Sequence, residues 1–105
     1  MSAFDAPGFI EHEIDKNESL ELRRKRLKFR SWHRGIKEAD ILLGHFADKH
    51  LHELNHDQLD RYENLLREPD LKIVAWITND SPAPDHLKND VMDMLQALDY
   101  LKIMK

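Results

Sequence analysis

Residues 34–54 read RGIKEADILLGHFADKHLHEL, and this stretch decides the fold class. Its apolar residues recur three and four positions apart, at Ala39, Leu42, Leu43, Phe46, Ala47 and Leu51. That spacing places them on one face of an amphipathic helix, which we expect over 37–54. Gly35 comes just before this helix and suits the left-handed residue that often closes a preceding one. We therefore expect two helices joined by a turn at Gly35.

The residues on either side extend the helical pattern. A first helix is expected over 18–34, with arginines along one side and apolar residues beside them. A third helix opens at Asn55, because an Asn followed three residues later by Gln58 is the pattern of a capping box. The expected connections are short, so the helices should pack against one another.

Two prolines predict the later corners of the chain. Pro69 suits the start of a fourth, short helix, and Pro82 lies in a polar break before a last helix expected over 85–101. Neither an alternating strand pattern nor an internal repeat is present in the sequence. The predicted fold class is therefore all-α, a compact five-helix bundle.

The start of the chain has a different character. Residues 1–17 contain Pro7 and Gly8, show no sustained periodicity, and mix acidic residues with isolated apolar ones. Such a segment is predicted to be a flexible acidic tail. The domain division that follows is 1–17 as tail and 18–105 as a single helical domain.

The composition limits the location and class of the protein. The chain has 105 residues and no cysteine, so a disulfide scaffold or thiolate metal site is excluded and a reducing compartment fits. Its apolar runs are only a few residues long, and its start does not resemble a secretory signal, so membrane insertion is not expected. A bacterial cytoplasmic protein is predicted, with a processed mitochondrial matrix form as the alternative.

Charge is divided unevenly along the chain. Residues 18–38 carry eight Lys or Arg against three Glu, a local charge of +5, which leaves −9 for the rest of a chain whose total is −4. On the first helix, one side is predicted to carry an arginine stripe made of Arg23, Arg26, Arg30 and Arg34. A basic element on an acidic body favours oriented docking onto an acidic protein surface.

The junction between the first two helices concentrates groups suited to recognition. Arg34 offers a planar fork for a carboxylate or for backbone carbonyls, and Gly35 allows another backbone to approach closely. Glu38 and Asp40 are expected in the first turn of the second helix, where negative charge is favoured. The alternative is an ordinary helix-closing glycine beside a solvated Arg–Glu pair, and the spacing leaves both readings open.

The residues around this junction resemble a known family. Residues 26–43, RLKFRSWHRGIKEADILL, are similar to the Arg-Gly-x-x-Glu region of the small succinate dehydrogenase assembly factors. The family pattern continues at Phe46, Leu51, 59–66, Pro69, Asp70, Ile73 and Trp76. One departure is Asn79, which stands where the family often has a glycine after the tryptophan-containing helix.

This resemblance implies a function in assembly without catalysis. Family members are five-helix proteins that help attach FAD covalently to the flavoprotein subunit of succinate dehydrogenase, with the fumarate reductase flavoprotein as a further client. The resemblance places Arg34, Gly35 and Glu38 on the docking face, with Ser31, Asp40 and Arg30 completing the predicted partner-binding set. The FAD belongs to the client, so no cofactor of its own is expected, and the free chain is expected to be a monomer.

Other kinds of site find little support. Four histidines lie close in sequence, but His45 and His52 are two turns apart, about 10 Å along a helix axis, and no ligand set is complete. No serine sits in a nucleophile motif, so no catalytic or metal-binding residues are predicted. The rival reading is a nucleic-acid-binding or regulatory module that uses the arginine-rich first helix. The acidic remainder opposes it, and no nucleic acid partner is expected.

Overall fold

The computed structural model describes residues 18–103, so the tail predicted over 1–17 lies outside the described part. Its helices are α1 (Leu20–Trp32), α2 (Lys37–His50), α3 (His56–Leu66), α4 (Asp70–Ile77), α5 (Asp90–Gln96) and the four-residue α6 (Tyr100–Ile103). Short 3-10 helices η2 (Leu51–Glu53) and η3 (Asp85–Leu87) connect them. These residues contain no strand, so the all-α prediction is confirmed. Within the same range, every helix is too short or too polar to cross a bilayer.

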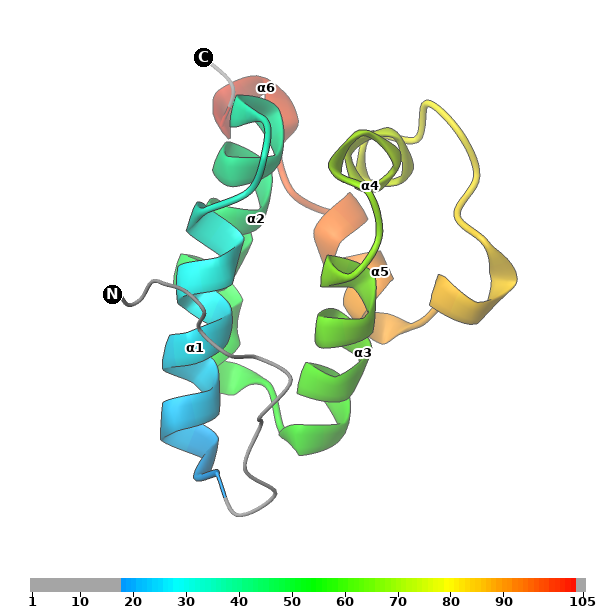
Figure 1. The fold of residues 1–105 in the computed structure, drawn as a ribbon. Coiled ribbons are helices and arrows are strands. Elements are labelled where there is room, and N and C mark those ends of the chain that lie inside the picture. Colours follow the sequence, from blue (N-terminus) through cyan, green and yellow to red (C-terminus); the bar gives the residue numbers. More distant parts are fainter. Residues whose placement is uncertain (1–17, 104–105) are drawn as a thin grey trace.

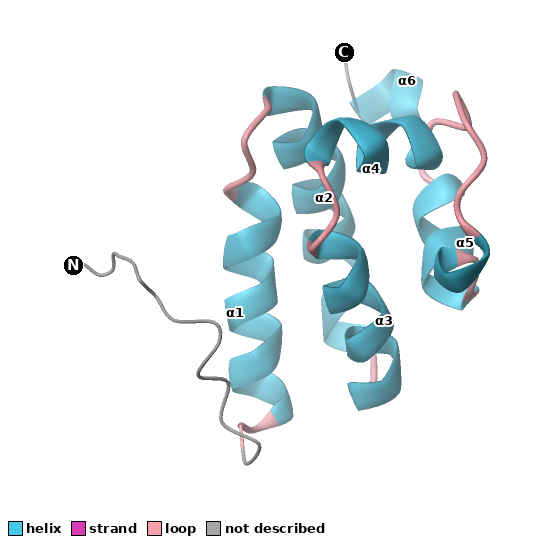
Figure 2. Ribbon diagram, turned by 45° about the vertical axis from the view of Figure 1, so that its right-hand side comes forward, coloured by secondary structure: helices cyan, strands magenta, loops and turns pink. Residues whose placement is uncertain are grey.

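The first three helices run antiparallel to their neighbours, and α4 lies across one end of them (Figures 1 and 2). The turn between α1 and α2 and the turn between α3 and α4 therefore meet at that end. Helix α5 packs against α3 and α4, and α6 packs against α2. Residues far apart in the sequence are thus brought together at the α4 end of the bundle.

The helix starts follow from their caps. Ser19 accepts a hydrogen bond from the amide of Leu22 at 3.1 Å and begins α1. At α3 the predicted capping box is confirmed, because the Asn55 side chain accepts from the Gln58 amide and the Gln58 side chain accepts from the Asn55 amide. Pro69 takes the N-cap position of α4 and lies just outside the helix it was expected to start.

The prediction of one continuous last helix over 85–101 is wrong. The chain there divides into η3, α5 and α6. Asn89 is extended and accepts a hydrogen bond from the amide of Met92, and Asp99 accepts one from the amide of Lys102. Both short polar side chains cap a new helix where the apolar periodicity alone predicts continuation.

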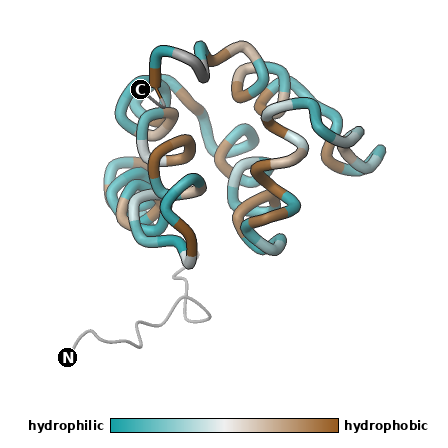
Figure 3. Tube along the Cα trace, turned by 90° about the horizontal axis from the view of Figure 1, so that it is seen from above, coloured by the Kyte–Doolittle hydropathy of each residue, from teal (hydrophilic) through white to brown (hydrophobic). Residues whose placement is uncertain are grey.

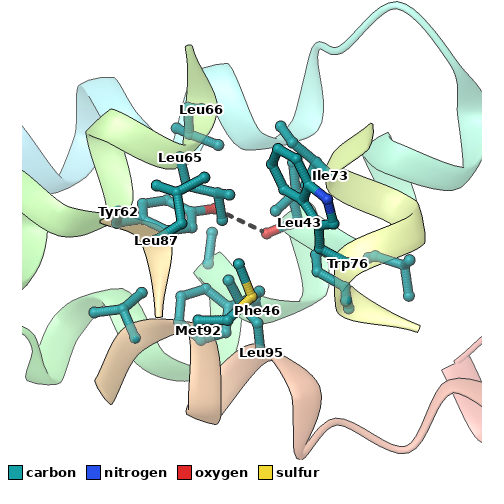
Figure 4. Packing of buried hydrophobic residues seen from close by; sticks show 14 of the residues in the cluster. Leu43, Phe46, Tyr62, Leu65, Leu66, Ile73, Trp76, Leu87, Met92 and Leu95 are labelled. Carbon is teal, nitrogen blue, oxygen red and sulfur yellow. Dashed lines mark hydrogen bonds between the residues drawn. The ribbon is translucent and has the colours of Figure 1, made fainter. Parts of the chain in front are cut away.

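The apolar faces of the helices meet in one core. Along each helix, hydrophobic and polar residues alternate in the manner of helices that bury one face (Figure 3). Phe46 and Tyr62 are the largest fully buried side chains, and Trp76 is buried beside them at 7% exposure (Figure 4). The Tyr62 hydroxyl lies 2.6 Å from the Ser31 hydroxyl and 3.4 Å from the Leu43 carbonyl. Burial raises the pKa of Tyr62, which keeps this hydroxyl neutral.

Close packing of α1 on α2 depends on a glycine. The Trp32 ring lies over Gly44, where an added Cβ would come within 2.3 Å of the ring. The Trp32 indole N–H donates to Asp48 at 3.2 Å. Gly44 therefore allows α1 and α2 to approach closely, with the Trp32 ring packed between them.

Candidate docking site

The α1–α2 junction is tied to the start of α4 by a single carboxylate. Arg34 Nε donates to Asp70 Oδ1 at 2.8 Å, and the amide of Gly35 donates to Asp70 Oδ2 at 2.6 Å. The same guanidinium donates through Nη2 to the carbonyl of Leu66 at 2.8 Å, near the end of α3. We call residues 34–38 the docking turn. Its first two residues are held by groups that lie more than 30 positions further along the chain.

A second carboxylate stabilises the turn from within α2. Ile36 occupies the N-cap position of α2 and offers no side-chain hydrogen bond there. Asp40, in the first turn of α2, accepts a hydrogen bond from the backbone amide of Arg34. Both Glu38 and Asp40 lie in that first turn, as predicted. The negative charges are favourable there, and Asp40 also closes the junction.

The expectation of a left-handed Gly35 is wrong. No described glycine has a positive φ, so Gly35 adopts backbone angles open to other residues. The constraint on Gly35 is space, because a Cβ built on it would lie 3.0 Å from Asp70 Oδ2. The left-handed conformation occurs instead at Asn79, with φ of 64°, where the chain leaves α4. Asn tolerates this conformation better than most residues other than glycine.

The predicted partner-binding residues differ in the surface that they offer. Gly35 and Glu38 are exposed, and the Glu38 side chain has no hydrogen bond or ion pair with any residue over 18–103. The Arg34 side chain is only 10% exposed because Asp70 and Leu66 surround its guanidinium. Asp40 is half-buried at the junction. A partner-binding role stays a prediction for these residues, with Gly35 and Glu38 the most accessible.

Ser31 lies in a different environment from the exposed part of the turn. Its side chain is 0% exposed, and its hydroxyl donates to the Leu27 carbonyl at 2.7 Å while pairing with Tyr62. In this conformation a partner cannot reach the hydroxyl. Ser31 therefore links α1 to α3 from inside the bundle.

The arginine stripe faces α3 and does not form an open basic surface. Arg26 contacts Glu63 at 2.9 Å, Arg23 contacts it at 3.2 Å, and Arg30 contacts it at 3.8 Å. We call this group the arginine seam. The arginine charges are therefore largely satisfied within the protein, and docking guided by the basic element stays a prediction.

Electrostatics of the seam follow from its partial burial. The Glu63 side chain is 6% exposed, and burial alone would raise its pKa. Hydrogen bonds and charge from Arg26 and Arg23 overcome this effect and lower the pKa of Glu63. Burial would also lower the pKa of Arg26, but its hydrogen bonds to Glu18 and Glu63 raise it. The carboxylate and the guanidinium groups are therefore charged together near neutral pH.

Two residues that organise the site were not assigned roles from the sequence. Glu63 lies four positions after Leu59 and three before Leu66, so it occupies the buried face of α3. A buried acid opposite an arginine stripe was a usable signal. Asp70 follows Pro69 in the first turn of a short helix, which gives no indication of a partner 35 residues earlier. Only the tertiary arrangement shows its contact with the docking turn.

The described histidines do not gather around a common point with acidic groups. Among residues 18–103, no group of three or more His, Asp or Glu side chains is placed to hold a metal ion. The His45 ring nitrogen Nδ1 donates to the Ile41 carbonyl, and His50 pairs with Glu53. These side chains are engaged in local contacts on α2 and η2.

Comparison with known proteins shows that the docking turn lies in a region that matches a protein family. Residues 25–99 match a family model described as the flavinator of succinate dehydrogenase. Similar curated proteins include mitochondrial succinate dehydrogenase assembly factor 2 from Meyerozyma guilliermondii, 45% identical over 83 residues, and from Candida glabrata, 43% identical over 90 residues. The protein of the same name from Danio rerio is 41% identical over 81 residues.

These alignments cover most of this chain and a smaller part of each relative. They include 75%, 81% and 75% of this chain and 62%, 59% and 51% of the respective relatives. The chain thus spans about three fifths or less of the length of these proteins. All three are named as mitochondrial and come from eukaryotes, and this finding overturns the prediction of a bacterial cytoplasmic location.

Proposed function

The chain belongs to the flavinator family of succinate dehydrogenase, and on that premise we propose that it binds the flavoprotein subunit of that enzyme and promotes covalent FAD attachment. The observation that carries the proposal is the family match over residues 25–99, which includes the whole docking turn. The geometry supports it, because this turn presents exposed groups on a rigid frame.

The docking turn has the properties of a preorganised contact surface. Asp40 and Asp70 hold its backbone amides, and the Leu66 carbonyl holds the Arg34 guanidinium, before any partner arrives. Binding then loses little conformational entropy at this point, which favours affinity from a small surface. Glu38 would accept a donor from the client, and the exposed residue Gly35 would lie on the same contact surface.

In this proposal the chain acts by selecting a conformation of its client. The flavoprotein carries out the covalent attachment with its own groups and its own FAD. Covalent attachment requires the reacting groups to be aligned, and a partner that binds the aligned conformation more tightly raises its population. The chain needs neither catalytic residues nor a cofactor for this role. We extend the proposal to the related fumarate reductase flavoprotein, and to a free protein that is monomeric.

The test is coexpression with the flavoprotein subunit, followed by measurement of in-gel flavin fluorescence after denaturation. We expect more covalent FAD with the wild-type chain than without it, and less with Glu38→Gln. The matched control is Asp57→Asn, because Asp57 is also an exposed first-turn acid without a described partner, at the start of α3. Equal covalent FAD with and without the wild-type chain would contradict the proposed function.

A further inference from the structure

Asp70 contacts the docking turn, and it lies outside the Arg-Gly-x-x-Glu signature. We propose that Asp70 is a positioning residue of the docking turn, and that Gly35 is required because the Asp70 carboxylate occupies the space a side chain would take. This inference rests on the proposed function, because it concerns how the same turn is presented to the flavoprotein.

The first step of the argument is that one carboxylate serves two donors. Oδ1 accepts from the Arg34 guanidinium at 2.8 Å, and Oδ2 accepts from the Gly35 amide at 2.6 Å. The two donors are consecutive residues, so a single group sets the direction of the guanidinium and of the peptide unit beside it. An Asp side chain offers two acceptor oxygens, whereas Asn offers one acceptor and an N–H₂ that cannot accept.

The second step is that Asp70 is itself firmly placed. It lies in the first turn of α4, where the helix dipole favours a negative charge, and its side chain is 17% exposed. Helix α4 packs against α2 and α5. The carboxylate is therefore anchored to the bundle, and the turn is held against it.

The third step concerns Gly35. A Cβ at this position would lie 3.0 Å from Asp70 Oδ2, closer than an ordinary carbon–oxygen contact. Because Gly35 has no positive φ, backbone strain does not explain the need for glycine. The carboxylate cannot retreat without lengthening its hydrogen bonds to Arg34 and to the Gly35 amide. A side chain at residue 35 would therefore displace the Asp70 carboxylate in the free protein, before a client binds.

This arrangement predicts coupling between the two positions. If Gly35 is needed because of the Asp70 carboxylate, then Gly35→Ala should weaken client binding only while that carboxylate is present. If Gly35 is needed for close approach of the client, Gly35→Ala should reduce binding in either background. A double-mutant cycle separates these two cases.

The experiment measures affinity for the purified flavoprotein subunit with wild type, Asp70→Ala, Gly35→Ala and the double variant. We expect each single change to weaken binding about tenfold, and the double variant to be weakened about tenfold and not about a hundredfold. Asp57→Ala is the matched control for loss of a first-turn acid, and it should bind like wild type. The proposal would be overturned if the double variant bound about a hundredfold more weakly than wild type. It would also be overturned if Asp70→Ala bound with wild-type affinity.

A second measurement distinguishes positioning from a general loss of structure. Hydrogen exchange of the Gly35 amide in the free protein should accelerate in Asp70→Asn, which keeps the size of the side chain, while amides in the core of α3 keep their protection. Unchanged Gly35 exchange would overturn the positioning role. Failure of the wild-type chain to bind the flavoprotein would instead overturn the proposed function, so the two failures are distinguishable.

Discussion

The arginine seam and the docking turn use the same chemistry in opposite ways. In the seam, Arg23, Arg26 and Arg30 surround one carboxylate, Glu63, and most of the charge faces inward. In the docking turn, one carboxylate also holds a guanidinium, but the residues beside it remain exposed. The difference teaches that a dense run of arginine can join helices and leave little open basic surface, while a turn held by one carboxylate keeps exposed groups beside it.

Removal of the seam carboxylate should have the largest effect on stability. Glu63→Gln leaves three guanidinium groups facing an uncharged side chain in a partly buried site, so we expect a loss of about 3 kcal/mol in the free energy of unfolding. The measurement is urea denaturation followed by circular dichroism. The control is Asp60→Asn, because Asp60 contacts the same Arg23 but its side chain is 63% exposed. It should cost less than about 1 kcal/mol.

A similar loss for both variants would mean that burial does not distinguish the two carboxylates. In that case the seam would be an ordinary set of surface ion pairs. The contrast between an enclosed seam and an open turn would then disappear.

Acid should weaken the seam in a defined direction. The pKa of Glu63 is lowered in the folded protein, so its contribution is complete above the ordinary Glu pKa of about 4.3 and is lost as pH falls through the lower folded value. We therefore expect the unfolding free energy of the wild type to fall more steeply below about pH 4 than that of Glu63→Gln. The two curves should be compared at constant ionic strength. Parallel curves would contradict the role of this carboxylate.

How far the sequence could predict each region depends on the range of its interactions. The helix starts at Ser19 and Asn55 depend on residues three positions apart, so local chemistry predicts them. The break at Asn89 is also local, but the apolar repeat around it masks the capping signal. Helical periodicity thus predicts the existence of elements better than their ends.

The turn between α1 and α2 was predictable in position, but its contacts were less so. The resemblance around Arg34 and Gly35 located the turn, and Glu38 lies exposed in the first turn of α2. The inward direction of the arginine stripe was not predictable from α1 alone, because it depends on which face α3 covers. The hydrogen bond from the Gly35 amide to Asp70 joins residues 35 positions apart, and no periodic pattern predicts such a contact.

The contact between α1 and α2 lies between the two regions and can test whether they are independent. In Gly44→Ala the new Cβ would lie within 2.3 Å of the Trp32 ring, so we expect a loss of about 1–3 kcal/mol in the free energy of unfolding. In a Trp32→Ala background the same change should be neutral or stabilising, because Ala favours helix over Gly by about 1 kcal/mol. Thermal and urea unfolding of the four proteins would give the coupling energy. Equal effects in both backgrounds would exclude a clash with Trp32.

The smallest effect on stability should accompany a clear effect on function, in the exposed part of the docking turn. Glu38 has no described partner, so Glu38→Gln should change the free energy of unfolding by less than about 0.5 kcal/mol. If its carboxylate accepts a donor from the flavoprotein, affinity should fall about tenfold, measured by titration of the purified subunit. Asp57→Asn should change neither quantity appreciably, because Asp57 lies at the start of α3, away from the turn. A Glu38→Gln variant with reduced stability and unchanged affinity would assign the residue to the framework, and the seam and the turn would then share one role.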